Sequence, residues 1–224
     1  QLGGTPVAKN FLSPNDPPPA DTPLLDVNAL WKYDASGADL GTAWRGAGYN
    51  DSAWPTRVNL TRQSVSGLFN TGVSAGGTVL APGQSDPHYI LTVNAQGAAG
   101  AVPLVMAPNP AWLANDACSA WIGAVSSGSA TIAGGNYHFQ TTFPLDGFLL
   151  STMQLLFRVS VDNDLNSVGL NGVTFPITHS GFAGFSGPLI LDNGFVNGVN
   201  TLEFRSSNAG AGPGGFRAVV SGTG

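Results

Sequence analysis

Charged side chains are scarce in this chain. Only 9% of its 224 residues are Asp, Glu, Lys or Arg, against roughly 25% in an ordinary soluble domain. The 8 basic residues do not cluster, so the sequence lacks the positive patch through which proteins contact nucleic-acid phosphates. Its 42% of hydrophobic residues is too high for a disordered chain. We therefore expect a folded protein that has a mostly uncharged surface and does not bind nucleic acid.

Cysteine is nearly absent, and so are long apolar runs. The single Cys118 excludes an intrachain disulfide, and we expect it to be buried as a small hydrophobic residue. No run approaches the roughly 18 apolar residues of a transmembrane helix, so we expect no membrane span. The chain begins at Gln1 without a methionine, which favours export through a cleaved signal peptide. We expect an extracellular or cell-surface location.

Helical periodicity is also missing, because no window shows an amphipathic stripe longer than about two turns. Apolar residues alternate instead in short runs at residues 137–143, 153–161, 201–206 and 216–220. Residues 162–164 and the pair Asn171 and Gly172 predict turns, and the Gly-rich residues 208–215 predict a hairpin loop between the last two strands. Many short strands with frequent turns predict an all-β protein, an antiparallel β-sandwich or jelly roll.

Proline is concentrated at the beginning of the chain, where residues 1–23 contain six of the 16 prolines. Its fixed φ and missing N–H favour extended backbone there. Val7, Phe11 and Leu12 supply an apolar segment before this spacer. We expect residues 1–23 to form an extended N-terminal arm and residues 24–224 to form the sandwich, with residues 24–70 either inside it or in a separate strand set.

The last third of the chain has a recognisable order of strands and turns. The sequence FRVSVDNDLNSVGLNGVTF is followed by GFSGPLILDNGFVNGVNTLEF and a closing strand after a Gly-rich loop. This order resembles the galactose-binding-like jelly roll that accompanies many bacterial glycosidases. The stretches GGTVLAPGQSDPHY from Gly76 and SAWIG from Ser119 are similar to secreted bacterial proteins of the PEP-CTERM type, whose sorting tail would begin just after Gly224. The resemblance implies an extracellular β-sandwich and brings no catalytic residues with it.

Residues that carry catalysis are few. Glycoside hydrolysis needs two carboxylates, and the only glutamate, Glu203, alternates with apolar neighbours as an outward strand residue would. The histidines, which are His88, His138 and His179, show no metal-ligand spacing. We expect no catalytic activity.

Two pairs of residues are candidates for binding. We interpret Asp162 and Asp164 as turn residues that bond their own backbone, with a Ca²⁺ site as the weaker alternative and no other cofactor expected. Tryptophans fill sandwich cores, but a sugar also packs well on an exposed indole ring. Trp112 and Trp121 are therefore our candidates for sugar stacking.

Two functions fit these observations. The first is a non-catalytic secreted structural protein that assembles with copies of itself into an extracellular filament or biofilm matrix. In that case Val7, Phe11 and Leu12 of the arm complete an open sheet edge of the next copy. The alternative is a carbohydrate-binding module or adhesin whose partner is an extracellular polysaccharide.

Overall fold

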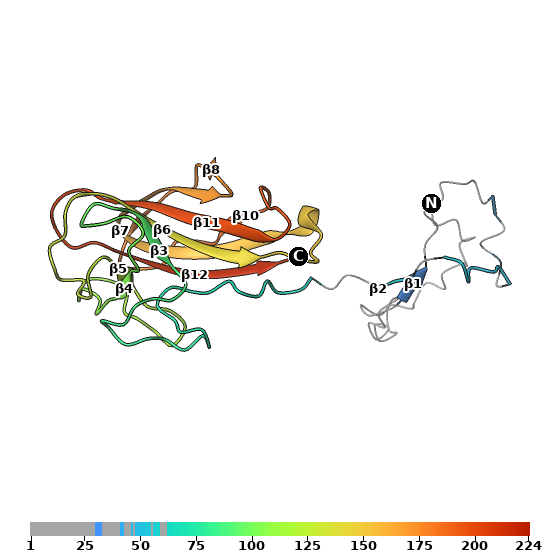
Figure 1. Ribbon diagram of the computed structural model, residues 1–224, viewed down its shortest axis with the longest axis horizontal. Coiled ribbons are helices and arrows are strands. Elements are labelled where there is room, and N and C mark those ends of the chain that lie inside the picture. Colours follow the sequence, from blue (N-terminus) through green and yellow to red (C-terminus); the bar gives the residue numbers. More distant parts are fainter. Residues whose placement is uncertain (1–29, 33–40, 43–45, 47, 55, 59–61) are drawn as a thin grey trace, which may run out of the picture. The chain divides into compact units, whose positions relative to one another are not determined.

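The computed structural model describes residues 30–32, 41–42, 46, 48–54, 56–58 and 62–224 (Figure 1). The chain divides into two units, residues 1–61 and residues 62–224. In the smaller unit, β1 (Leu30–Lys32) pairs antiparallel with β2 (Thr56–Val58). Val7, Phe11 and Leu12 of the predicted arm lie outside the described residues, and so does its predicted boundary at residue 23.

The larger unit is built almost entirely from antiparallel strands, so the predicted all-β, sandwich-like fold is confirmed. In the described residues the only helix is a short 3₁₀ turn, Leu150–Thr152, and no helix there is long and apolar enough to cross a membrane. The strands are β3 (Ile90–Asn94), β4 (Leu104–Val105), β5 (Ile122–Gly123), β6 (Gly135–Pro144), β7 (Gln154–Leu170), β8 (Val173–Phe175), β9 (His179–Gly181), β10 (Leu189–Leu191), β11 (Val199–Asn208) and β12 (Gly215–Thr223).

Strand β7 connects two groups of strands. Its residues 154–162 pair with β12, which continues to β5 and β4. Its residues 164–170 pair with β11, which continues to β6 and β3. The opposite edge of β7 pairs with the short strands β10, β9 and β8.

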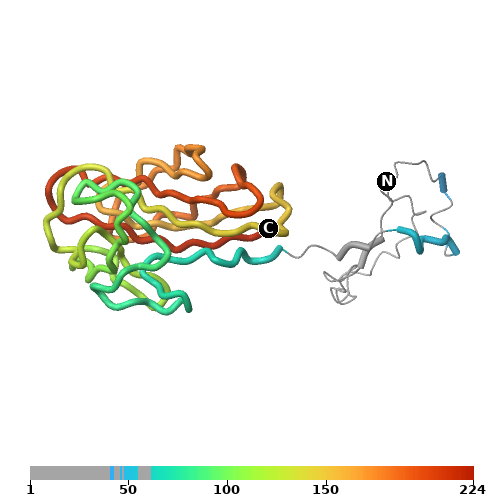
Figure 2. The backbone as a smooth tube through the Cα atoms, in the orientation of Figure 1, coloured from blue at the N-terminus to red at the C-terminus, as the bar shows by residue number. Residues whose placement is uncertain are grey.

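The two groups face each other because β7 bends sharply. Phe204 lies in register with Val168 of β7, and Phe216 with Val161. Along a straight strand these two positions would be about 23 Å apart, at roughly 3.3 Å per residue. The ring centroids of Phe204 and Phe216 are nevertheless only 5.0 Å apart. Figures 1 and 2 accordingly show β11 and β12 running along the same length of the sandwich.

Buried phenylalanines from both groups form the centre of the core. Phe216 of β12 lies 5.0 Å from Phe139 of β6 as well as from Phe204 of β11, and Phe157 of β7 meets Phe204 edge-on at 5.4 Å between centroids. These side chains alternate with outward-facing residues along β6 and β11, as the period of two predicted.

The turn predictions were right at one site and wrong at two. Asn171 and Gly172 have φ angles of 51° and 84° and close the β7–β8 hairpin as predicted. Residues 162–164 do not separate two strands, because they lie inside β7, which continues through them as one bent strand. Residues 208–215 are not a hairpin loop, because β11 and β12 both pair with β7 and not with each other.

Residues 62–71 lie along the edge of β12 that faces away from β7. Gln63 and Gly224 exchange backbone hydrogen bonds of 2.8 and 3.1 Å, and the Val65 N–H donates to the Gly222 carbonyl at 2.8 Å. Val65 is buried against Gly222, where an added Cβ would come within 2.9 Å of it. The chain segment that enters the sandwich is therefore part of its sheet and its core.

Replacing Phe216 tests whether the two groups of strands pack against each other in the core. Phe216→Ala removes the ring that touches both Phe139 and Phe204, and we expect a loss of about 3–5 kcal/mol in the free energy of unfolding. Urea denaturation followed by fluorescence measures it. The exposed Val173→Ala is the control and should change stability by less than about 0.5 kcal/mol. Equal losses of unfolding free energy in the two variants would contradict the packing of the two groups of strands against each other.

Candidate functional site

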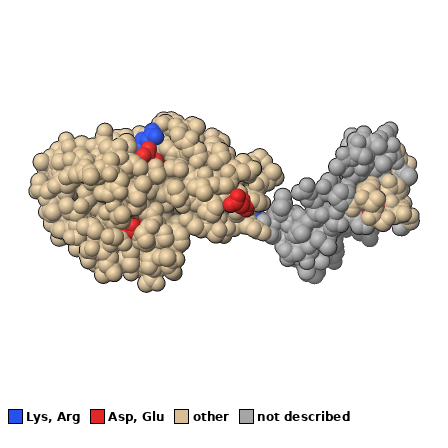
Figure 3. Space-filling model, viewed as in Figure 1, with Lys and Arg blue, Asp and Glu red and all other residues tan. Residues whose placement is uncertain are grey.

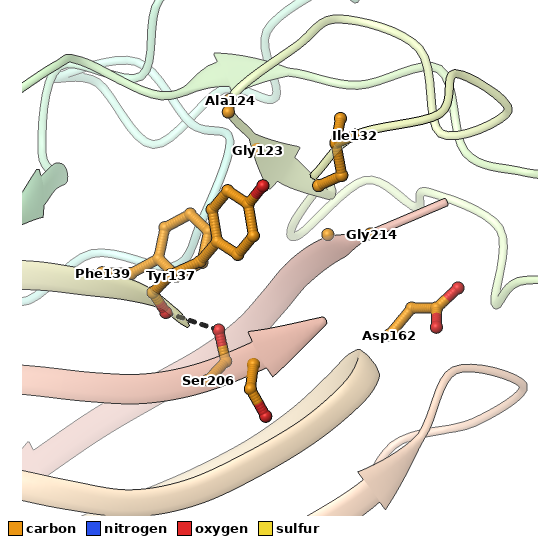
Figure 4. A pocket seen from close by; sticks show the side chains of 10 residues that line it. Gly123, Ala124, Ile132, Tyr137, Phe139, Asp162, Ser206 and Gly214 are labelled. Atoms are coloured by element: carbon orange, nitrogen blue, oxygen red, sulfur yellow. Dashed lines mark hydrogen bonds between the residues drawn. The ribbon is translucent and has the colours of Figure 1, made fainter. Parts of the chain in front are cut away.

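A small pocket lies at the end of the sandwich where β7 bends, and its cavity volume is about 10 Å³ (Figure 4). A cavity needs roughly 10–15 Å³ to hold one water molecule, so this pocket is too small for an organic ligand. Its hydroxyl groups also bond within the protein. The Tyr137 hydroxyl donates to the Ala133 carbonyl at 2.8 Å, and the Ser206 hydroxyl donates to the Tyr137 carbonyl at 2.6 Å. The pocket is better suited to water than to an organic ligand.

Asp162 lines this pocket and is 8% exposed. The Trp112 Nε1–H donates to Asp162 Oδ2 at 2.9 Å. Burial raises the pKa of Asp162 above its ordinary 3.8, and the charge of Asp164 adds to the rise, while the bond from Trp112 opposes it. Asp162 thus connects the bend of β7 to a tryptophan distant in sequence.

The predicted roles of Asp162 and Asp164 need correction. Asp164 accepts a 2.5 Å hydrogen bond from the Ser180 hydroxyl, so both aspartates bond side chains from other segments rather than their own backbone. Their position in a continuous ladder explains this, because the local backbone is paired with β11 and β12. Within residues 62–224 and the other described positions, no three His, Cys, Asp or Glu side chains come together as a metal site.

Trp112 and Trp121 are not available for sugar stacking. They are 6% and 0% exposed, and their ring centroids lie 4.4 Å apart. Both rings pack with Met106 in a small second core, and the Trp121 Nε1–H donates to the Leu113 carbonyl at 2.7 Å. A sugar needs an exposed ring face, so the structure contradicts the prediction for these two residues.

Arg217 of β12 is fully buried, a feature that the sequence did not indicate. Its Nε–H donates to Ser119 Oγ at 2.9 Å, its Nη2 lies 2.6 Å from Asp116 Oδ2, and its guanidinium is 4.8 Å from the centre of the Phe185 ring. Burial opposes ionisation of Asp116, but the Cys118 N–H and the charge of Arg217 hold its pKa below the ordinary value. Arg217 thus holds the loop around residues 114–119 over the outer side of β12.

Cys118 lies in this loop and is exposed, so the predicted burial of Cys118 is wrong. The reason is local. The carboxylate of Asp116 accepts the backbone N–H groups of Cys118 and Ser119, at 2.8 and 3.0 Å, and forms a turn that directs Ser119 inward toward Arg217.

A second polar cluster lies on the opposite outer face and contains the only glutamate of the chain. Glu203 Oε2 accepts from Arg205 Nε–H at 2.6 Å, and Glu203 Oε1 accepts from the Thr92 hydroxyl at 2.6 Å. Arg205 Nη1–H also donates to Thr174 Oγ1 at 2.7 Å, and His138 Nδ1 lies 3.9 Å from Glu203 Oε1. Glu203 therefore points outward, as predicted. On the face of the molecule drawn in Figure 3, blue and red atoms occupy only a few small areas.

The charges of this outer-face cluster balance at neutral pH. Burial opposes ionisation of Glu203, but the hydrogen bonds from Thr92 and Arg205 hold its pKa below the ordinary value. Burial lowers the pKa of His138 below 6.5 despite the nearby carboxylate. Near pH 7 the cluster therefore contains one carboxylate, one guanidinium and a neutral imidazole. The sequence signal for this cluster was the spacing of Glu203 and Arg205 by two residues, which places both on the same face of a strand.

No family model matches the chain, and no curated protein or solved structure matches it either. The resemblance to galactose-binding-like and PEP-CTERM-type proteins stays a prediction.

Replacing Asp162 tests the buried carboxylate. A raised pKa means that the folded state binds the proton of Asp162 more tightly than the unfolded state does. The stabilisation that this proton gives the folded state at low pH is lost as the pH rises through the raised pKa. Asp162→Asn keeps an oxygen for the Trp112 N–H and cannot ionise. We expect it to be at least as stable as the wild type at pH 7, with the difference vanishing below the ordinary pKa of 3.8.

Thermal unfolding from pH 3 to pH 8 measures this dependence, and Asp162→Ala, which removes the hydrogen bond, is the control. If Asp162→Asn is as destabilised at pH 7 as Asp162→Ala, ionised Asp162 stabilises the fold and the interpretation is wrong.

Proposed function

We propose that this protein is a non-catalytic structural protein of the cell exterior that assembles with copies of itself through its N-terminal arm. Residues 7–12 of one copy add a strand to the sandwich of the next. The observation that supports the proposal best is an open apolar edge at β10, where the described strands provide a partner on one side only.

The edge exposes a pair of apolar side chains. Ile190 of β10 lies directly opposite Leu156 of β7, and the two residues are 49% and 40% exposed. Leu191 next to them is buried in the core. An incoming strand would bond the free backbone groups of β10 and cover part of this pair, so that hydrogen bonding and apolar burial both favour its addition.

The residues around β10 limit the length of the acceptor. Edge strands are commonly protected from association by charge, by proline and by shortness. Here the protection lies at the ends, because Pro188 precedes and Asp192 follows a strand of three apolar residues. Such an acceptor suits a short apolar segment, and Val7, Phe11 and Leu12 provide one.

This mode of contact leads to open chains of subunits. The arm and the β10 edge are different surfaces, so each copy offers one donor and one acceptor. Contacts of this heterologous kind form filaments when the rotation between neighbours does not close a ring. The low surface charge favours such assembly, because charged surfaces repel one another.

Two changes test the assembly. Deletion of residues 1–23 removes the donor, and Ile190→Lys places a charge on the acceptor. We expect both variants to sediment as folded monomers under conditions in which the full chain forms larger species. Val173→Lys introduces the same charge at an exposed site on edge strand β8 and serves as the matched control, which should still assemble. Sedimentation velocity measures the distribution, and circular dichroism checks the fold.

Larger species that persist after the deletion would contradict the role of the arm. Loss of assembly in both lysine variants would contradict the specific role of β10.

A further inference from the structure

A row of residues crosses one outer face of the sandwich, opposite to the outer face on which Arg217 lies. Strand register places Ile90 of β3, Gln140 of β6, Glu203 of β11, Gly169 of β7 and Thr174 of β8 side by side. Because Phe204, next to Glu203, points into the core, this row faces away from it. The row provides a continuous outer surface across five neighbouring strands.

Gly169 allows Arg205 to lie along this surface. A Cβ at Gly169 would come within 3.0 Å of Arg205 Nη2 and 3.3 Å of its Cζ. With no side chain beneath it, the guanidinium extends over the sheet to Thr174 and still donates to Glu203. Two of its nitrogens are used in this way, and Nη2 has no hydrogen-bond partner among the side chains and backbone described in the larger unit.

A β-bulge brings Thr92 next to the Glu203–Arg205 pair. The pairing of β3 with β6 shifts by one residue between Leu91 and Val93, so that the extra residue is Thr92. Its hydroxyl donates to Glu203 Oε1 at 2.6 Å. Bulges redirect side chains in this way and are frequent beside functional sites. The carboxylate is thus held from both sides, and the Glu203–Arg205 pair is fixed before any ligand arrives.

The chemistry of this surface suits hydroxyl groups. A carboxylate accepts hydrogen bonds and a guanidinium donates them, so the pair can bond two neighbouring hydroxyls of one sugar. Gln140 adds both a donor and an acceptor beside them. Ile90 at the β3 end of the row is exposed, and the antiparallel bridge between Leu91 and Ala101 places the exposed Val102 beside it, so both can pack against the C–H groups of a sugar ring. A cluster with balanced charge gives an acidic polymer no electrostatic advantage.

We propose that this outer face binds a neutral polysaccharide, with Glu203 and Arg205 as the residues that bond its hydroxyls. The site uses neither β10 nor residues 1–23, so it does not depend on assembly. It also differs from the tryptophan site that the sequence suggested, because polar side chains rather than indole rings make the contact.

Affinity gel electrophoresis of the full chain tests this proposal. The gels contain dextran, galactomannan or soluble starch as neutral polymers, and alginate as an acidic one. We expect retardation by at least one neutral polymer, and a loss of at least about tenfold in affinity for it in Glu203→Gln and in Arg205→Met, because each change removes a charge-assisted hydrogen bond to the polymer. The matched control is Asp146→Asn, which removes an exposed carboxylate elsewhere and should leave binding unchanged.

Thermal unfolding verifies that each variant is folded, and Glu203→Asp gives a second variant that retains the charge. The proposal would be overturned if no neutral polymer retarded the protein. It would also be overturned if the wild type and the folded Glu203→Gln and Arg205→Met variants were retarded equally. Retardation by alginate alone would also overturn it.

Discussion

The contact between facing phenylalanine side chains holds the two halves of β7 against each other, and the rest of the larger unit depends on it. Phe204 belongs to the group of strands paired with the second half of β7, and Phe216 to the group paired with the first half. Their rings meet only because the strand bends at residues 162–164. The bend creates two layers from one hydrogen-bonded sheet and places the small pocket at their common end.

The two layers have outer faces of different character. On β12 the outward Arg217 is buried beneath the loop that contains Asp116, and Trp112 and Trp121 pack nearby in a second core. On β11 the outward Glu203 and Arg205 stay partly exposed. The tryptophans of this sandwich thus help to attach a covering loop, while the other face keeps polar groups accessible. The second face and the β10 edge are therefore the surfaces that we propose for binding a polymer or a partner.

Local patterns in the sequence predicted the local structure well. Alternation of apolar residues identified β6, β11 and β12, and Asn171 with Gly172 identified a hairpin whose backbone needs positive φ angles. The same alternation, with a period of two residues, also predicted correctly that Glu203 points outward. These features depend on neighbouring residues alone, so one sequence is sufficient to find them.

Features set by distant contacts were not predictable in the same way. Nothing near Asp162 in the sequence shows that Trp112 will bond it, and nothing near Arg217 shows that Asp116 will cover it. The position of the covering loop and the facing of β11 and β12 across the bend of β7 also depend on contacts between segments that are distant in sequence. Burial of a polar or aromatic residue depends on which segment packs over it, and hydrophobic periodicity does not contain that information.

We propose that this protein acts through surfaces that the folded sandwich presents, above all through strand addition at β10. Amide hydrogen exchange followed by mass spectrometry, on assembled full chain and on the variant lacking residues 1–23, tests that claim most directly. We expect the amides of residues 189–191 to exchange more slowly in the assembled protein, while those of β8 and β3 keep their rates. Unchanged exchange at β10, or slowing confined to β8 or β3, would contradict it.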